Sequence, residues 1–508
     1  MNQLPLWDEA PSDERSTIPL LSKSRFAAGL QCHKRLYLEC YHRNLMDPLD
    51  PGRKALFETG TRVGLVARSC FPGGVWIQED HFHHDEAVRR TALALRDRSV
   101  PAIYEAAFTC GDVRVRVDIL SRADGDEWDL IEVKSSASVK EEYLPDVAVQ
   151  LHVVEGSGVR VRRAGLLHVN NRYVYPGGPY DLERLFVLRD QTEAALEYRP
   201  SVLDALEAMR EPLRRRTPPD IVPGAQCTRP YACPFYGHCH TDGPEHPLTD
   251  LPRAGVRLLE ALQAAQVADI REIPEDFEGL SDLQRRVRAC VISGSAHADP
   301  ELRRHLGSLS HPIHFLDFET CNPALPLYPG TRPFQQIPFQ WSNHALLKSG
   351  PARHAEYLHE GKADPRLPLA EALADALADA GTIVVYSGFE ERIIRSLAEE
   401  FPALAPRLLP LVEDRMVDLL ELIRAHYYHP EFHGSFSIKD VLPALVPGFG
   451  YQDLTIREGG QAGAWYVEMI DPATPPTRRA EIRDALRAYC HRDTDAMVRL
   501  FHALQEVT

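Results

Sequence analysis

The sequence predicts an α/β protein built from two α/β units with a helical connector between them. Strand-like runs and helical segments alternate between residues 102 and 169, and again from Pro312 onward. Between these regions, from Asp250 to about Leu309, the pattern is helical. The chain has 508 residues, more than one ordinary hydrophobic core holds, so two or three domains are expected. The order of the elements therefore implies two separate α/β units.

The composition is that of a folded protein, with 44% apolar and 26% charged residues and a formal net charge of −16. This charge argues against general adhesion to polyanions, although carboxylates around divalent metals also raise the acidic count. The N-terminus lacks the basic residues and apolar run of a signal peptide, and no stretch approaches about eighteen apolar residues. A cytoplasmic location away from membranes is expected, where cysteines stay reduced and a cysteine cluster would bind metal.

The secondary structure expected in the first half is a set of helices around a run of strands. Helices are expected over residues 21–41, 54–71 and 142–152. Strands are expected over residues 102–108, 113–120, 128–136 and 163–169. The second strand alternates Val and Ile with Arg and Asp, the period of a half-buried strand, and a turn-forming segment after it predicts a hairpin. In the second half, strands are expected over residues 313–320, 339–347 and 382–386, with helices between and after them.

The predicted hairpin brings potential metal ligands together. Asp118 projects from the polar face of its strand, and Glu132 and Lys134, two residues apart, share a face of the next strand. Two carboxylates at this place can hold Mg²⁺ or Mn²⁺ through oxygen ligands. A lysine beside them can orient a water or hold a scissile phosphate. A salt bridge across a solvated hairpin is the alternative interpretation of these residues.

Two further residues extend this group, because Glu105 precedes it and Gln150 follows it in a predicted helix. The ordered set resembles the RecB-type branch of PD-(D/E)XK nucleases, whose fold is restriction-endonuclease-like. The resemblance implies that Asp118 and Glu132 bind metal, with Glu105 as a further candidate ligand. It also implies that Lys134 assists catalysis and that Gln150 completes the site.

A group of cysteines follows this region. Cys227, Cys233 and Cys239 have five residues between neighbours, unlike the paired spacing of zinc ribbons, and Cys32 is the candidate fourth ligand. One distant cysteine plus three clustered ones resembles the iron–sulfur staple of RecB-like nucleases, which implies a structural [4Fe–4S] cluster. A zinc site that uses His238 or His240 as the fourth ligand is the alternative. The remaining cysteines are expected to be small core residues: Cys40, Cys70, Cys110, Cys290, Cys321 and Cys490.

The second half carries its own set of carboxylates. Asp317 and Glu319 lie two apart on a predicted strand and share one face. Tyr489 and Asp493 are four residues apart, so on a helix they project from the same face. This pattern resembles the tyrosine-bearing DEDD subgroup of DnaQ-like exonucleases, which have a ribonuclease-H-like fold. The resemblance implies that the carboxylates hold two metal ions and that Tyr489 orients the attacking water.

The middle carboxylate departs from the family pattern, because Glu390 stands where the family carries an aspartate. Ser387 and Glu390 also fit a capping box, which is a purely structural explanation for this glutamate. Asp418 is a backup ligand, with a role on a helix surface as the alternative, and His491 is expected at the surface rather than as a general base. Residues 429–451 resemble a segment of an uncharacterised bacterial exonuclease-like family that is found joined to RecB-like domains.

These patterns predict four regions and a metal-dependent nuclease. The regions are a flexible tail at residues 1–17, a PD-(D/E)XK domain at 18–245, a helical connector at 246–308 and a DnaQ-like domain at 309–508. The predicted function is hydrolysis of DNA phosphodiester bonds by a PD-(D/E)XK centre and a 3′→5′ exonuclease centre, in repair, recombination or defence. DNA that is single-stranded or has free ends is the expected substrate, and RNA stays open. The sequence contains no Walker-type nucleotide loop, so unwinding would require a partner helicase or another repair or defence subunit.

Two alternatives stay open. In the first, one centre is active and the DEDD-like domain is a nucleic-acid-binding module, which the substituted Glu390 favours. In the second, the chain is a DNA-binding scaffold subunit of a larger complex, against which the intact Asp118, Glu132 and Lys134 argue. Arginine runs at residues 160–163 and 210–216 could guide a strand, but such runs are ordinarily solvated surfaces.

Overall fold

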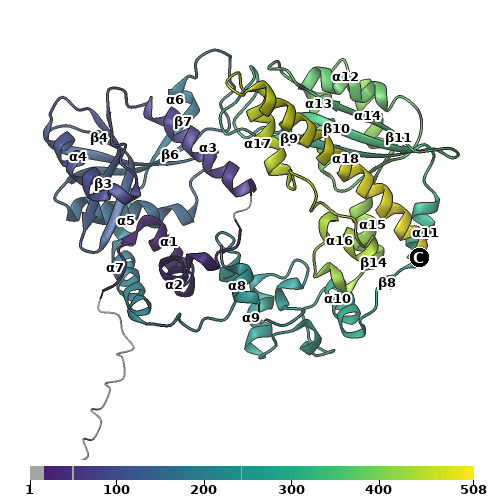
Figure 1. The fold of residues 1–508 in the computed structure, drawn as a ribbon, viewed down its shortest axis with the longest axis horizontal. Helices are drawn as coiled ribbons and strands as arrows, with labels where there is room; N and C mark the ends of the chain where they lie inside the picture. The colour runs from purple at the N-terminus through teal and green to yellow at the C-terminus, as the bar shows by residue number, and fades with distance from the viewer. Residues whose placement is uncertain (1–16, 49–50, 242, 508) are drawn as a thin grey trace, which may run out of the picture. The chain divides into compact units, whose positions relative to one another are not determined.

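The computed structural model describes residues 17–48, 51–241 and 243–507. The predicted tail at residues 1–17 therefore lies outside the described residues, apart from Thr17. The chain divides into two compact units, and each is a mixed α/β structure (Figure 1). Unit 1 comprises residues up to 50, residues 56–242 and the segment Ala324–Phe334, and unit 2 comprises the rest. The predicted α/β class is thus confirmed.

Unit 1 is built on one mixed sheet. Its strands are β1 (Leu21–Ser22), β2 (Val75–Trp76), β3 (Ala102–Cys110), β4 (Val113–Arg122), β5 (Glu127–Lys134), β6 (Arg160–Val169) and β7 (Phe186–Asp190). The order is β2-β3-β4-β5-β6-β7, and β1 pairs with β4. Strands β3, β4 and β5 form an antiparallel meander, whereas β5 and β6 are parallel. A parallel pair needs a crossover, and here a helix supplies it.

The helices of unit 1 cover both faces of this sheet. They are α1 (Lys23–Gln31), α2 (His33–Tyr41), α3 (Pro51–Arg68), α4 (His84–Arg96), α5 (Leu144–Gly156), α6 (Leu182–Leu185), α7 (Thr192–Arg214) and α8 (Tyr236–His240). Helix α5 is the crossover between β5 and β6, and it packs with α7 against Val113, Val115 and Val117 of β4. On the other face, Val63 and Ala67 of α3 pack in a second apolar cluster.

The single helix expected over residues 21–41 is wrong, because the structure has two helices with a break at Cys32. Cys32 adopts an extended conformation, with φ −166° and ψ 125°. The two helices serve different apolar clusters, which explains the break. Phe26 of α1 belongs to the main core of unit 1, whereas Tyr37 and Leu38 of α2 pack with Phe235 near the clustered cysteines.

Unit 2 is built on a five-stranded sheet. Its strands are β9 (Ile313–Cys321), β10 (Ile337–Leu346), β11 (Arg353–Leu358), β12 (Ile383–Val385) and β13 (Met416–Asp418), in the order β11-β10-β9-β12-β13. Strands β9, β10 and β11 are antiparallel neighbours, and β12 is parallel to both β9 and β13. A small second sheet pairs β8 (His297–Ala298) with β14 (Tyr427–Tyr428). Strand β9, which carries the predicted Asp317 and Glu319, is therefore central.

Helices pack on both faces of this second sheet. They are α9 (Val256–Ala264), α10 (Asp282–Ser293), α11 (Pro300–Gly307), α12 (Arg366–Ala376), α13 (Phe389–Glu400), α14 (Ala405–Glu413), α15 (Leu419–His426), α16 (Ile438–Leu445), α17 (Gly459–Ile470) and α18 (Pro476–Val507). Leu316 and Phe318 of β9 face α12 and α13 in one apolar cluster. Phe315 contacts Phe501 of α18, with the ring centroids 5.5 Å apart. Because side chains alternate along a strand, Asp317 and Glu319 also face α18.

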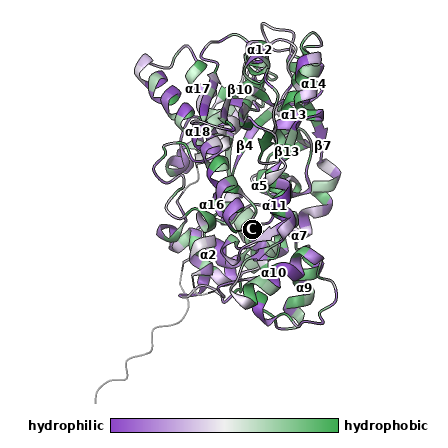
Figure 2. Ribbon diagram, turned by 90° about the vertical axis from the view of Figure 1, so that its right-hand side faces the viewer, coloured by the Kyte–Doolittle hydropathy of each residue, from purple (hydrophilic) through white to green (hydrophobic). Residues whose placement is uncertain are grey.

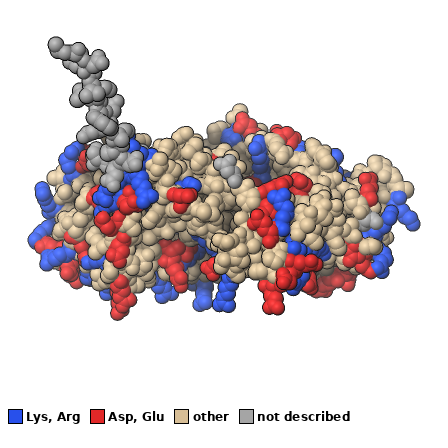
Figure 3. All heavy atoms as spheres, turned by 90° about the horizontal axis from the view of Figure 1, so that it is seen from below, with Lys and Arg blue, Asp and Glu red and all other residues tan. Residues whose placement is uncertain are grey.

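The predicted helical connector at residues 246–308 contains α9, α10, α11 and the short strand β8, and these residues belong to unit 2. Individual helices carry both hydrophilic and hydrophobic residues, as expected for helices that cover a sheet on one side (Figure 2). Acidic and basic side chains are interspersed on the surface that Figure 3 presents. None of the helices in the described ranges combines the length and apolarity needed to cross a bilayer.

Candidate functional site

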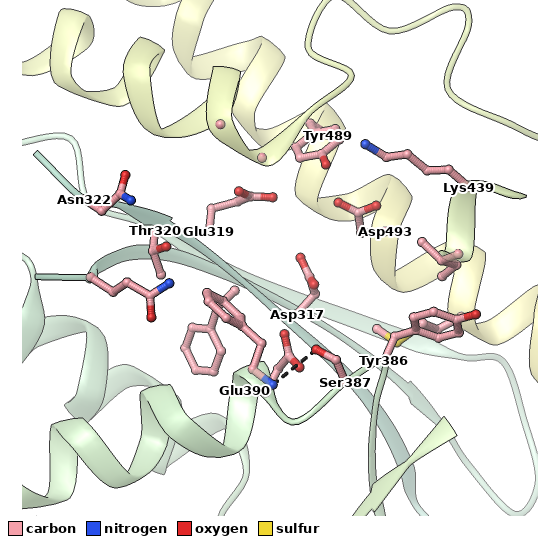
Figure 4. Close-up of a pocket in the computed structure, with 17 residues that line it drawn as sticks. Asp317, Glu319, Thr320, Asn322, Tyr386, Ser387, Glu390, Lys439, Tyr489 and Asp493 are labelled. Atoms are coloured by element: carbon pink, nitrogen blue, oxygen red, sulfur yellow. Dashed lines mark hydrogen bonds between the residues drawn. The ribbon is translucent and has the colours of Figure 1, made fainter. Parts of the chain in front are cut away.

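A cavity of about 400 Å³ in unit 2 is lined by carboxylates from three different elements. Asp317 and Glu319 come from β9, Glu390 comes from the first turn of α13, and Asp493 comes from α18. The four carboxylates point toward one another in Figure 4. Tyr489 lines the same cavity one helical turn before Asp493. The structure therefore brings Tyr489 together with the four carboxylates of Asp317, Glu319, Glu390 and Asp493.

Burial makes this group of carboxylates electrostatically costly. Burial and the neighbouring carboxylates raise the pKa values of Asp317 and Glu319 well above their usual range. Burial also raises the pKa of Glu390 to about 8, with Asp418 and Asp493 adding to the shift. Burial raises the pKa of Asp493 to about 6, although a hydrogen bond from the Tyr451 hydroxyl opposes it. Like charges held this close favour proton uptake or the binding of a cation.

Three residues that contact or lie near this group of side chains were not predicted as functional. The Tyr451 hydroxyl donates to Asp493 Oδ1 at 2.5 Å. The ammonium group of Lys439 lies 5.7 Å from the Tyr489 ring centroid and lowers the pKa values of Glu319 and Asp493. The thiol of Cys490 lies 3.7 Å from Asp317 Oδ2. Cys490 is buried, as expected of a small core residue, but its sulfur contacts the carboxylates of the site. Sequence spacing gave no signal for these long-range contacts.

The capping box expected from Ser387 and Glu390 does not form. The N-cap of α13 is Gly388, and no side chain caps this helix. Ser387 has a φ of 154° and its hydroxyl accepts from the backbone N–H of Phe389 at 3.2 Å. The Glu390 side chain is instead buried in the cavity, and its Oε2 atom has no hydrogen-bond partner among the described residues. The structural explanation for this glutamate is therefore wrong.

Asp418, the predicted backup ligand, caps α15 instead. Its Oδ1 accepts from the backbone N–H groups of Leu420 at 2.9 Å and Glu421 at 3.3 Å. This carboxylate still raises the pKa of Glu390, so it lies in the electrostatic range of the cavity. A helix N-cap explains the residue without a metal.

The raised pKa values of the cavity carboxylates predict how the free energy of unfolding of unit 2 changes with pH. The pKa values of Glu390 and Asp493 are raised to about 8 and about 6, above the roughly 4.3 and 3.9 of unfolded chains. Buried histidines such as His344, whose pKa is lowered, oppose this effect below about pH 6.5, so the folded state binds more protons than the unfolded state between about pH 6.5 and about pH 8. We expect the urea midpoint of unit 2, measured in EDTA, to fall as the pH rises through this window.

Saturating Mg²⁺ should remove this fall, because a bound cation replaces the protons that the carboxylates otherwise require. The measurement is urea unfolding followed by tryptophan fluorescence at several pH values, with and without Mg²⁺. A midpoint in EDTA that rises over the same window would contradict the assigned carboxylate cluster.

In unit 1, the predicted carboxylates also lie on neighbouring strands. The pairing of β4 with β5 ends at Ile119 and Ile131, and two residues further along β5 the N–H of Val133 donates to Asp118 Oδ2 at 2.7 Å. Glu132 is buried and accepts from the Gln150 side-chain amide of α5 at 2.8 Å. Burial raises the pKa of Asp118 to about 7, and the charge of Glu132 adds to this shift.

Two lysines neutralise Glu132. Lys134 Nζ lies 3.0 Å from Glu132 Oε1 and 2.6 Å from Asp146 Oδ2. Lys23 of α1, a residue that the sequence did not single out, lies 2.8 and 2.9 Å from the two Glu132 carboxylate oxygens. Burial alone would raise the pKa of Glu132, but these two ammonium groups hold it at about 2. No local pattern links Lys23 to a glutamate 109 residues later.

Glu105 lies at the margin of this group. It has a φ of 59°, and its carboxylate pairs with Arg68 at 2.9 Å and with Arg116 at 3.7 Å. It nevertheless raises the pKa of Asp118. The structure therefore brings Asp118, Glu132, Lys134 and Gln150 together, with Glu105 at the margin and engaged by arginines.

Several of the arginines proposed as a strand guide in unit 1 pair with acidic residues. Arg162 pairs with Asp129 at 2.6 Å, and Arg160 and Arg163 pair with Asp126 and Asp190 at 3.6 and 4.0 Å. Arg210 pairs with Asp112 at 2.7 Å. Because carboxylates already pair with these arginines, they are weak evidence for a nucleic-acid surface. This agrees with the alternative that such arginine runs are ordinary solvated surfaces.

The four predicted cluster cysteines gather around one small cavity in unit 1. Cys32, from the break between α1 and α2, lines it together with Cys227, Cys233 and Cys239. Burial raises the pKa values of the Cys233 and Cys239 thiols. The close groups of potential metal ligands among the described residues, with ligand atoms within 4.8 Å, do not include these thiols. They surround a common space without the tight approach of a single-ion site.

Comparison with known families gives one match. The model of a family described as a domain of unknown function (DUF2779) matches residues 314–437. No curated protein matches the chain. The matched segment includes Asp317, Glu319 and Glu390 but ends before Tyr489 and Asp493. The match covers part of unit 2, and the description of the family gives no activity.

Proposed function

We propose that the protein is a divalent-metal-dependent nuclease with two hydrolytic centres, an exonuclease centre in unit 2 and a PD-(D/E)XK centre in unit 1. The observation that carries this proposal is the convergence of four carboxylates from β9, α13 and α18 on one cavity, three of them buried and that of Asp317 partly buried. Buried carboxylates this close are stabilised by divalent cations, and an all-oxygen ligand set suits Mg²⁺ or Mn²⁺.

The ligand set fits such ions on the chemistry of this cavity. The pKa values of Asp317 and Glu319 are raised by burial and by mutual repulsion, and Glu390 Oε2 is buried without a hydrogen-bond partner among the described residues. Asp317, Glu319 and Asp493 would hold the ions, with Glu390 as the fourth carboxylate. Bound divalent ions supply activation of an attacking water and stabilisation of the leaving oxygen.

The other residues of the cavity have roles that follow from their positions. Tyr489 lies beside Asp493 and would orient the attacking water with its hydroxyl. Tyr451 holds Asp493 through a hydrogen bond and so fixes the direction of that carboxylate. Lys439 brings a positive charge to the cavity, where it would contact a substrate phosphate. A cavity of about 400 Å³ suits a chain end better than a duplex, which supports end trimming.

The proposal for unit 1 rests on Asp118 and Glu132, which would hold one divalent ion. Gln150 fixes the Glu132 carboxylate, and Lys134 is held between Glu132 and Asp146. Lys134 would orient a water or the scissile phosphate. Lys23 also contacts Glu132, so a metal ion would have to share or replace its position. This feature makes the first centre the more strongly charge-compensated of the two.

The cysteine cavity fits a polynuclear cluster better than zinc. Tetrahedral zinc with Zn–S bonds of ~2.3 Å places its sulfurs roughly 3.8 Å apart. The thiols of Cys32, Cys227, Cys233 and Cys239 do not form such a close group. In a [4Fe–4S] cluster each thiolate binds a different iron, so the sulfurs stand farther apart. We therefore favour the iron–sulfur cluster, which would join the N-terminal helices to the segment after α7.

Cys239→Ser is expected to remove this cluster. Protein purified without oxygen should show a visible absorbance shoulder near ~400 nm, and the variant should lose both this shoulder and its bound iron. The thermal midpoint of unit 1 should also fall, because the cluster closes a long loop. Cys70→Ser is the matched control, since Cys70 is a partly buried cysteine of unit 1 outside the cavity. Bound zinc without iron in the wild-type protein would contradict the assignment.

A further inference from the structure

Three histidines far apart in the sequence meet on one side of unit 2. His344 comes from β10, His354 from β11 and His491 from α18. Their ring centroids are 4.5, 4.7 and 4.5 Å apart, which makes a nearly equilateral triangle. One potential ligand nitrogen of each ring lies within 4.8 Å of the other two. Edge-to-edge contact of aromatic rings is the alternative explanation for this arrangement.

The hydroxyl groups of Thr494 and Ser342 orient two of these rings through hydrogen bonds. His344 Nδ1 is 2.8 Å from Thr494 Oγ1, and His354 Nε2 is 3.0 Å from Ser342 Oγ. The two hydroxyl oxygens are 2.8 Å from each other. One nitrogen of each ring is therefore fixed, which directs the other nitrogen toward a potential ligand. Histidines that bind metals in proteins are commonly oriented in this way by a second hydrogen bond.

The spacing of the rings is close to that of three imidazoles around one metal ion. With Zn–N bonds of ~2.0 Å and tetrahedral angles, ring centroids would stand roughly 5.2 Å apart. The observed 4.5 to 4.7 Å is shorter by only about half an ångström, so small side-chain rotations would admit an ion. Edge-to-edge contact alone does not require three equal distances.

The protonation state of these rings also suits a metal. Burial, followed by the charges of His354 and His491, lowers the pKa of His344 to about 4. Burial and His491 likewise lower the pKa of His354. Both rings are therefore neutral near pH 7, and a neutral imidazole is the form that binds metal.

We propose that His344, His354 and His491 bind one late first-row divalent cation of the zinc class, separate from the carboxylate centre. Imidazole ligands favour such ions over Mg²⁺ and Ca²⁺, which prefer oxygen. The ion would join two strands of the sheet to α18, the helix that carries Tyr489 and Asp493. Its role would be structural, since it would hold α18 against β10 and β11. The proposal is independent of any nuclease activity.

Zinc titration tests this site directly. The full-length protein, stripped of metals and kept in excess Mg²⁺ to occupy the carboxylates, is titrated with Zn²⁺ by calorimetry. His354→Ala and His491→Ala remove exposed rings of the cluster and should each bind one zinc equivalent fewer than the wild type. His502→Ala is the matched control, because His502 is an exposed histidine of the same helix outside the cluster, and it should bind as the wild type does.

Any zinc that binds at the cysteines would add the same number of equivalents to the wild type and to all three variants. It would therefore not affect the difference between them. Zn²⁺ should also raise the thermal midpoint of the wild type more than that of either cluster variant. Equal zinc stoichiometry in the wild type and in both cluster variants would overturn the proposal, even if the variants were less stable, because aromatic contact alone would then explain the cluster.

Discussion

Asp317→Asn is expected to abolish the end-trimming activity proposed for unit 2, with a loss of about a thousandfold or more in the rate of cleavage. The substitution keeps the shape of the side chain but removes one of the carboxylates that would hold the metal ions. Metal ligands of this kind contribute several kcal/mol to transition-state stabilisation, and about 4 kcal/mol corresponds to a thousandfold. The measurement is digestion of end-labelled single- and double-stranded DNA and RNA with Mn²⁺ or Mg²⁺.

The same variant should be more stable than the wild type in EDTA near neutral pH. Asp317 lies among Glu319, Glu390 and Asp493, and its desolvation and these charges raise its pKa, so its ionised form destabilises the metal-free fold. Loss of activity with a gain in stability separates a functional residue from a structural one. Asp375→Asn is the control, since Asp375 is exposed on α12 and pairs with Arg407 outside the cavity. An Asp317→Asn protein that trims ends at the wild-type rate would refute the exonuclease assignment.

Lys134→Ala is expected to abolish a different cleavage activity, with a loss of roughly a hundredfold to a thousandfold. Lys134 is held by Glu132 and Asp146 beside Asp118, where its ammonium group would face the scissile phosphate. Truncation removes this charge while Lys23 still neutralises Glu132. The fold of unit 1 should therefore survive, and circular dichroism would verify this.

The pattern of products tests whether the two centres are separate. Lys134→Ala should retain the trimming that Asp317→Asn loses, and Asp317→Asn should retain the cleavage that Lys134→Ala loses. Lys140→Ala is the matched control for the loss of a lysine, since Lys140 is largely exposed in the same region and pairs with Glu142. If both variants lost the same products, the chain would have one activity rather than two.

The regular elements of the sites were predictable because they depend on local periodicity. The alternation along β4 and β9 fixed the direction of Asp118, Asp317 and Glu319, and the four-residue spacing on α18 placed Tyr489 beside Asp493. Each of these relations involves residues within one strand or one helix. The carboxylates could therefore be assigned to faces before the fold was known.

The remaining residues of the sites depend on the packing of distant elements. Lys23 contacts Glu132, Tyr451 contacts Asp493, and Cys490 contacts Asp317, across separations of 109, 42 and 173 residues. No periodicity within a single element connects such pairs. The histidine cluster was missed for the same reason, because its members come from two strands and a helix and each is isolated in the sequence.

The two centres differ from expectation in how their charges are balanced. The substituted Glu390 suggested that the second domain had lost a ligand and had become a binding module. In the structure its carboxylate is buried in the cavity with Asp317 and Asp493, so the longer side chain still delivers an oxygen. In unit 1, by contrast, two lysines already neutralise Glu132. If only one centre is active, the charge balance favours the one in unit 2.

Whether these carboxylates bind divalent cations can be seen in a crystal structure of the protein soaked with Mn²⁺ and measured at the manganese absorption edge. We expect anomalous density on the order of 2 Å from carboxylate oxygens of Asp317, Glu319 and Asp493, and a further peak between Asp118 and Glu132. Carboxylates that gather as described but show no anomalous density at millimolar Mn²⁺ would contradict this expectation.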